Sequence, residues 1–113
     1  MATTLKRISG PAYLAATAAD IYTPPASTIY TVIKHIRLTN KTAGAITATL
    51  YVGSTGGSAA GTEILAAKSV AANDVYDIYF SPGLRMASTD FLSGLASSAT
   101  SMTITVMGEQ GVV

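Results

Sequence analysis

The segment from Ile29 to Val52 limits most strongly what this chain can fold into. Over residues 45–52, in the order Ala-Ile-Thr-Ala-Thr-Leu-Tyr-Val, apolar side chains alternate with hydroxyl-bearing ones. A repeat of two residues places the apolar set on one face of a β-strand and the polar set on the other. Residues 30–39 form a second strand-like run, and the Asn-Lys-Thr-Ala-Gly sequence between the two runs is typical of a tight turn. The pattern predicts a β-hairpin of two half-buried antiparallel strands.

Turn-forming residues divide the rest of the chain into further short strands. Clusters of proline and glycine interrupt it at residues 10–11, 24–25 and 81–83. The strand-like runs lie at residues 5–8, 20–23, 62–65, 68–70, 75–80, 84–86, 91–95 and 102–107. About seven to nine short strands without a convincing helix are typical of an antiparallel β-sandwich or a jelly-roll-like fold. We therefore expect an all-β fold in a single domain over residues 1–113, with flexible arms at 1–4 and 110–113.

The chain carries few charges. Charged residues make up 12% of it, against about 25% in an average soluble domain, and the net charge is +1. So small a charge predicts no long-range attraction to nucleic acid or to an anionic membrane. No apolar run is long enough to cross a bilayer, and residues 1–8 lack the apolar core of a signal peptide. A surface rich in Thr, Ser, Ala and Tyr is instead typical of contacts between protein subunits.

No group of residues forms a catalytic or metal-binding pattern. The sequence has no cysteine and a single histidine, His35, which leaves too few thiolate or imidazole ligands for a zinc site. Asp74 and Asp77 are the only close pair of carboxylates, and their positions in a turn and a strand do not direct both at one substrate. The glycine-rich segment 53–61 lacks the Gly-Lys-Ser/Thr ending of a phosphate-binding loop. We therefore expect a protein that is not an enzyme and that uses no cofactor or metal.

Two further groups of residues are candidates for contact with a partner. His35 and Arg37 share one face of a predicted strand, where they could contact an anion or, as single charges usually do, lie on a solvated or subunit-contacting face. Tyrosines can serve the core, a protein interface, or stacking on a sugar. The tyrosines for which these three uses are open are Tyr22, Tyr30, Tyr51, Tyr76 and Tyr79. We expect Tyr30 and Tyr76 to be core residues.

Several phrases of the sequence follow one another in an order that resembles a family of small phage virion proteins. The phrases are Asp-Ile-Tyr-Thr-Pro-Pro at 20–25, His-Ile-Arg-Leu-Thr-Asn at 35–40, Thr-Ala-Thr-Leu-Tyr-Val-Gly at 47–53, Ser-Pro-Gly-Leu at 81–84 and Ser-Met-Thr-Ile-Thr-Val-Met-Gly-Glu at 101–109. The resemblance implies a β-sandwich or jelly-roll subunit of a phage head or tail, located in the virion after assembly in the host cytoplasm. It also implies a symmetric homo-oligomer, a trimer or a ring, and other virion proteins as partners.

The sequence thus predicts a phage virion structural protein, a capsid decoration (cement) or tail-associated subunit that self-assembles and stabilises the particle. The expected interface is the exposed, hydroxyl-rich face of the predicted hairpin and of the last strand. Its residues are His35, Arg37, Thr47, Thr49, Tyr51, Thr103 and Thr105. The alternative hypothesis is a carbohydrate-binding module displayed on a virion or a cell surface. In that hypothesis Tyr51 and Tyr79 stack on the sugar.

Overall fold

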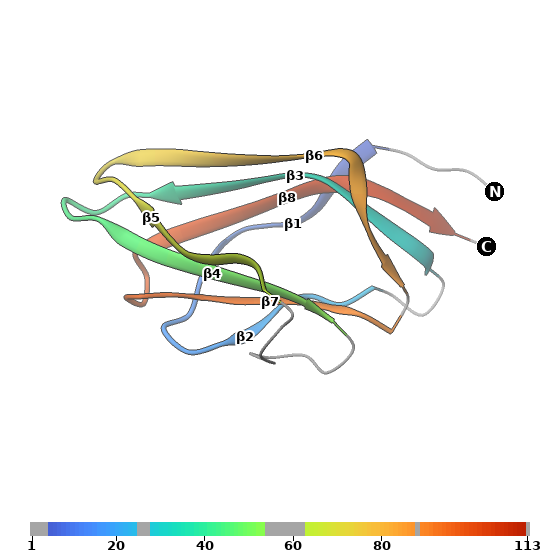
Figure 1. Ribbon diagram of the computed structural model, residues 1–113, viewed down its shortest axis with the longest axis horizontal. Helices are drawn as coiled ribbons and strands as arrows, with labels where there is room; N and C mark the ends of the chain where they lie inside the picture. The colour runs from blue at the N-terminus through green and yellow to red at the C-terminus, as the bar shows by residue number, and fades with distance from the viewer. Residues whose placement is uncertain (1–4, 25–27, 54–62, 88, 113) are drawn as a thin grey trace.

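The computed structural model describes residues 5–24, 28–53, 63–87 and 89–112, which form eight β-strands in two sheets (Figure 1). Sheet A contains, in spatial order, β1 (Leu5–Tyr13), β8 (Met102–Val112), β3 (Thr28–Asn40) and β6 (Asp74–Ala87). Sheet B contains β2 (Ala19–Tyr22), β7 (Phe91–Ala96), β4 (Ile46–Gly53) and β5 (Glu63–Val70). All neighbouring strands are antiparallel. This is the strand order of a two-sheet jelly roll, and it confirms the predicted all-β sandwich. No helix that could cross a bilayer occurs in the described ranges.

The predicted hairpin between residues 29 and 52 is wrong, although both of its strands exist. β3 pairs with β6 and β8 in sheet A, whereas β4 pairs with β5 and β7 in sheet B. The turn between them therefore crosses from one layer of the sandwich to the other (Figure 1). The alternation of apolar and polar residues identifies the buried face of a strand but not its neighbour. Two strands that pair in one sheet and two strands that face each other across the core have the same alternation, so the pattern does not distinguish them.

The core lies between the two sheets and consists of the inward-facing side chains of both. The largest fully buried apolar side chains are Leu14, Ile33, Ile36, Leu38, Leu50, Met86, Leu92, Met102, Ile104 and Val106. Burial of each such side chain stabilises the fold by about 1.5–3 kcal/mol. In β3, β4 and β8 the buried residues alternate with half-exposed ones, so each of these strands has one face in the core and one face outside.

β6 is one long bent strand where the sequence predicts two short ones. Its pairing with β3 jumps from His35 opposite Tyr79 to Ile33 opposite Leu84, so residues 80–83 bulge opposite Lys34 alone. The Nζ atom of Lys34 donates a hydrogen bond to the Pro82 carbonyl oxygen at 2.6 Å, which holds the bend against β3. β3 is itself irregular at this point, because its register with both β6 and β8 shifts between Ile33 and His35.

A buried asparagine joins the two turns at one end of the sandwich. The Asn40 side chain is fully buried. Its Nδ2 atom lies 2.8 Å from the carbonyl oxygen of Gly44 and 3.0 Å from that of Val70, and its Oδ1 atom accepts the backbone N–H of Thr42 at 2.9 Å. These contacts tie the end of β3 to the turn before β4 and to the end of β5.

Near the other end of β3, a second polar group links the sheets through the core. The Tyr22 hydroxyl on β2 lies 3.1 Å from the Thr31 hydroxyl on β3, and it accepts a hydrogen bond from the Gln110 side chain on β8. Gln110 is buried, and residues 110–112 pair with β3. The predicted flexible arm at 110–113 is therefore wrong for residues 110–112, which belong to β8. The predicted arm at 1–4 and residue 113 lie outside the described residues.

Candidate interaction surface

The structure divides the seven predicted interface residues between two opposite faces of the sandwich. His35 and Arg37 on β3, with Thr103 and Thr105 on β8, lie on the outer face of sheet A. Thr47, Thr49 and Tyr51 on β4 lie on the outer face of sheet B. The division follows from the failure of the predicted hairpin, because β3 and β4 turn their polar sides away from each other. No single flat surface of one subunit contains all seven residues.

On sheet A the predicted residues have neighbours from β6 that complete a continuous surface. Thr105, Arg37 and Asp77 form one row across β8, β3 and β6, and Met107, His35 and Tyr79 form the next. Residues directly opposite each other on neighbouring strands have their Cβ atoms about 4.5–5.5 Å apart, so their side chains interact. We call this surface, made by the outward-facing residues of β1, β8, β3 and the first half of β6, the A face.

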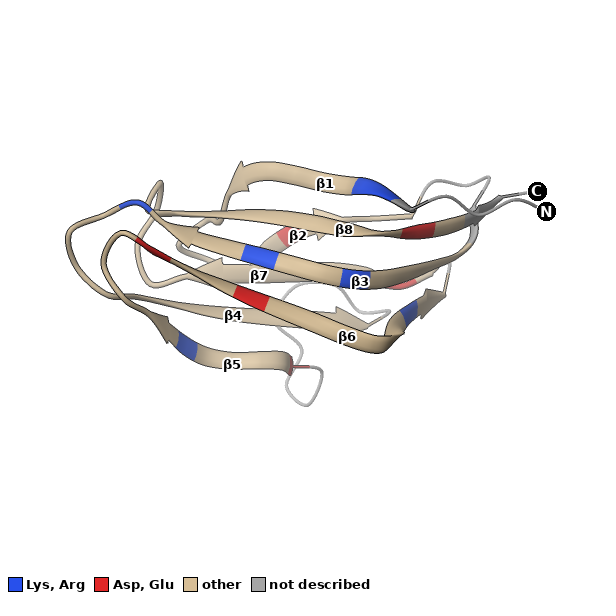
Figure 2. Ribbon diagram, turned by 90° about the horizontal axis from the view of Figure 1, so that it is seen from above, with Lys and Arg blue, Asp and Glu red and all other residues tan. Residues whose placement is uncertain are grey.

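The middle of the A face holds an ion cluster centred on Asp77. The Asp77 carboxylate accepts two hydrogen bonds from the Arg37 guanidinium, from Nε to Oδ1 at 2.7 Å and from a terminal nitrogen to Oδ2 at 3.1 Å. The Nε2 atom of His35 lies 2.9 Å from the same Oδ1 atom. Figure 2 shows how sparse the charged positions are on this sheet, with an acidic segment in the middle of β6 beside a basic segment of β3.

The electrostatics of this cluster indicate an ion pair, not an acid–base catalyst. The hydrogen bonds from Arg37 and then from His35 hold the pKa of Asp77 at about 2, below its ordinary value of 3.8. A carboxylate with this pKa stays ionised at neutral pH, and both of its oxygens are already occupied, so it has no proton to exchange with a substrate. Within the described ranges no three His, Cys, Asp or Glu side chains gather in a way that could hold a metal ion.

Acid should remove the contribution of this cluster to stability. Since the pKa of Asp77 is lower in the folded protein than its ordinary value, the stabilisation is complete above about pH 4 and is lost as the pH falls towards 2. We expect the wild type to be more stable than Asp77→Asn at neutral pH, and we expect that difference to shrink over this interval. Urea unfolding of both proteins between about pH 5 and pH 2 measures it. A difference that stays constant with pH would contradict the assignment.

The exposed large apolar side chains of the described residues lie on the A face. They are Tyr79 with 71% of its surface exposed, Tyr13 with 50% and Val75 with 43%. The Tyr79 ring stacks on the His35 ring with a centroid distance of 4.6 Å and an angle of 15° between their planes. Val75 and Tyr79 lie on either side of Asp77 along β6, and Tyr13 lies at the opposite edge of the sheet on β1. The A face thus combines aromatic, aliphatic and hydroxyl groups around one ion cluster.

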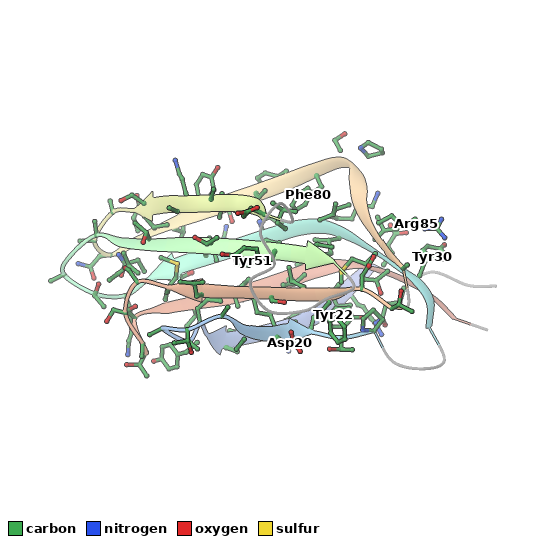
Figure 3. All side chains as sticks on the ribbon, turned by 60° about the horizontal axis from the view of Figure 1, so that its bottom comes forward. Asp20, Tyr22, Tyr30, Tyr51, Phe80 and Arg85 are labelled. Atoms are coloured by element: carbon green, nitrogen blue, oxygen red, sulfur yellow. The ribbon has the colours of Figure 1, made fainter. Side chains whose placement is uncertain are left out.

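The sequence predicts that two other tyrosines are core residues, and the structure agrees for one of the two. Tyr76 packs against the core, as predicted. Tyr30 is half-buried on the outer side of β3, with the Arg85 guanidinium 4.8 Å from the centre of its ring, so its predicted role as a core residue is wrong (Figure 3). In the pairing of β3 with β8, Ile33 lies opposite Gly108 and His35 opposite Met107, so Lys34 is an extra residue in β3. This bulge reverses the inward-facing parity of the strand and turns Tyr30 outward.

On the outer face of sheet B, hydroxyl side chains accept hydrogen bonds from backbone N–H groups. Thr49 Oγ1 accepts the N–H of Ala67 at 3.0 Å, and the N–H of Thr47 is bonded to the Ser97 hydroxyl at 3.1 Å. Tyr51 is half-buried and pairs with Ser93, whose hydroxyl lies 3.2 Å from the Asp20 carboxylate (Figure 3). Tyr51 and Tyr79 therefore lie on opposite faces, and they do not form one sugar-stacking platform.

A cavity of about 130 Å³ opens between β1 and β2, where the two sheets part. Its lining is mostly apolar, with Leu14, Ile21 and Ile104 among the lining residues and Asp20 as the charged one. It lacks the several convergent polar groups that orient a ligand in a typical small-molecule site.

Comparison with known proteins supports the fold. No protein-family model and no curated protein sequence matches this chain. A subunit of Bacillus endospore appendages, described as a family of disulfide-linked pili, superposes with a TM-score of 0.54 at 20% identity, over 98% of this chain and 88% of that one. A chain of infectious bursal disease virus, strain Gx, gives a TM-score of 0.47 at 11% identity, over 96% of this chain and 30% of that one. A pentameric capsid protein from metagenomic phage sequences gives 0.40 at 15% identity, over 95% of this chain and 66% of that one.

Proposed function

We propose that this chain is a structural, non-enzymatic subunit of a phage particle, a capsid decoration or tail-associated protein that binds copies of itself and other proteins of the virion. Assembly in the host cytoplasm and a location in the virion belong to the same proposal. The observation that carries it is the A face, which holds the exposed large apolar side chains of the described residues. His35, Arg37, Thr103 and Thr105 belong to this surface, and we leave Thr47, Thr49 and Tyr51 outside the proposed contact.

The chemistry of the A face suits burial against protein. Removing apolar area from water is favourable by about 25 cal/mol per Å², and Tyr13, Val75 and Tyr79 offer such area. Burying a charge is costly unless it is paired, and here Asp77 is already paired with Arg37 and His35. Aromatic residues and arginine are also enriched at protein interfaces.

The fold is compatible with this role. Two-sheet jelly rolls occur in viral capsid domains as well as in lectins, and the endospore pilus subunit shows the same fold in an assembling protein. That pilus family is described as disulfide-linked, whereas this chain has no cysteine. Association of this chain with its copies would therefore be non-covalent.

The solution mass of the purified chain tests the proposal. We expect light scattering after size exclusion to give a multiple of 11.5 kDa, such as a trimer or a closed ring. Tyr79→Lys places a charge in the middle of the exposed apolar group and should shift the mass towards that of the monomer. Thr47→Lys makes the same kind of change on the outer face of sheet B and should leave the mass unchanged.

A monomer at two well-separated concentrations would contradict self-assembly. Saturable binding to a glycan array, lost in Tyr79→Ala, would then support the sugar-binding alternative, for which Tyr79 offers an exposed ring beside polar groups. Equal loss of assembly in Tyr79→Lys and Thr47→Lys would show that the A face is not the specific contact.

A further inference from the structure

The open edges of the two sheets differ in how well they are protected from pairing with another strand. Within the described residues the edge strands are β1 and β6 in sheet A and β2 and β5 in sheet B. β1 has two register shifts and contains Pro11, and β2 has only four residues. β5 is irregular beside Ala67, which has a φ of 45°. Short, bulged or proline-containing edges such as these resist edge-to-edge pairing.

The first half of β6 has none of these protections. Residues 74–79 pair with residues 35–40 of β3 without a register shift. Their sequence, Asp-Val-Tyr-Asp-Ile-Tyr, contains no proline, glycine, lysine or arginine. The acidic side chain in its centre, Asp77, is held by Arg37 and His35 and does not act as a free charge along the edge. A regular, apolar edge of this length is a template for another strand.

The backbone of this segment presents hydrogen-bonding groups to the open side. The N–H of Val75 donates to the Asp74 side chain at 2.8 Å, which shows that it points away from β3. Backbone groups alternate in direction along an antiparallel strand, so those of Asp77 and Tyr79 point to the open side as well. It follows that Arg37–Asp77 and His35–Tyr79 are non-hydrogen-bonded pairs of the antiparallel ladder, in which the side chains lie closest together. The hydrogen bond between Arg37 and Asp77 and the stacking of Tyr79 on His35 agree with this.

We propose that two copies of this chain join through residues 75–79 of β6, which pair antiparallel about a two-fold axis and extend sheet A into a continuous eight-stranded sheet. The inference rests on the self-association proposed above and names a two-fold contact for it. This contact predicts a dimer or a ring built of dimers, and a trimer would overturn it while leaving the proposed function in place. Pairing the whole segment with itself places Asp77 opposite its own copy and Val75 opposite Tyr79 of the second copy. The aliphatic–aromatic pairs on the A face would then cover the two most exposed apolar side chains of β6.

The two Asp77 carboxylates at the axis do not prevent this pairing. Like charges directly opposite each other destabilise a sheet, but each carboxylate here is bonded through both oxygens to its own Arg37. The axis would hold two arginines with two aspartates, a set without net charge. A C2 contact of this kind uses the same surface on both subunits and closes on itself.

The absence of cysteine from the sequence makes cross-linking a direct test. A thiol introduced by Asp77→Cys is the only one in the chain, and opposite residues in an antiparallel pair lie about 4.5–5.5 Å apart at their Cα atoms, within the range that a disulfide spans. We expect Asp77→Cys to form a covalent dimer on mild oxidation. Thr105→Cys, on the same face but two strands away, should stay uncross-linked. Cross-linking at Thr105 without cross-linking at Asp77 would show that the faces stack instead.

Val75→Pro supplies a second test that leaves the apolar character of the A face unchanged. It removes an N–H that points to the open edge and is not bonded to β3, so the fold should be retained while edge pairing is blocked. We expect its mass in light scattering to fall to half that of the wild type or lower. If Val75→Pro keeps the mass of the wild type while Tyr79→Lys lowers it, edge pairing is wrong and the proposed function still stands. A monomeric wild type would overturn both.

Discussion

Asn40→Ala should destabilise the protein by about 3 kcal/mol, because a buried polar group left without its partner costs about 1–3 kcal/mol and more than one is lost here. The carbonyl oxygens of Val70 and Ala71 lose the Asn40 donor, and the N–H of Thr42 loses its acceptor. For a domain of this size the midpoint of thermal unfolding should fall by roughly 10–20 °C. Urea and thermal unfolding of the purified variant measure both quantities.

Thr39→Ala is the matched control for this experiment, since Thr39 is the neighbouring residue on β3 and faces outward. Its effect should stay within about 0.5–1 kcal/mol, as is usual for a surface position. Asn40→Asp keeps the shape of the side chain but replaces the donor with an acceptor, and it should be at least as damaging as the alanine. A loss below about 1 kcal/mol in Asn40→Ala would show that water or a small shift replaces these bonds.

Gly108→Ala should be comparably severe or prevent folding. Gly108 lies in the central part of β8, opposite Ile33 and just beyond the β3 bulge. A Cβ atom there would overlap the carbonyl oxygen of Val32, a backbone atom that no side-chain rotation can move away. Overpacking of a core typically costs about 1–3 kcal/mol even where side chains can adjust, so we expect a loss of at least about 3 kcal/mol. The yield of soluble protein and its urea midpoint report the effect.

Gly44→Ala provides the comparison, because a Cβ atom at Gly44 meets nothing within 4 Å. It should change stability by less than about 1 kcal/mol. If Gly108→Ala folded with the stability of Gly44→Ala, β8 and β3 would have to separate locally without loss, and the close approach of the two backbones would not be essential.

The sequence predicted the strands well and their partners poorly. The period of two over 45–52 and over 102–107 correctly located β4 and β8, because burial on one face leaves a local signature. Which strand lies beside which depends on contacts distant in sequence, so the turn at Asn40 read equally well as a hairpin or as a crossing between layers. The fully buried position of Asn40 could not be read from a residue type that is common in exposed turns.

The same limit explains what was missed at the candidate surface. The sequence places His35 and Arg37 on one face of a strand, but their partner Asp77 comes from β6, and the carboxylate nearest to it in the sequence is that of Asp74. The role of Asp77 becomes visible once β3 and β6 are known to pair. Val75, Asp77 and Tyr79 alternate with other residues in the sequence, which places their side chains on one face of a strand. The sequence did not show which strand lies beside them.

The two polar links between the sheets have a mechanical consequence. Apolar contacts across a sandwich have no preferred direction, so a core of alkyl groups alone offers little resistance to one sheet sliding over the other. Asn40 at one end of β3 and the Tyr22–Thr31–Gln110 group near its other end are directional and lie far apart along the strand. A sliding force must break both before the layers can shift, which makes the sandwich stiff in shear.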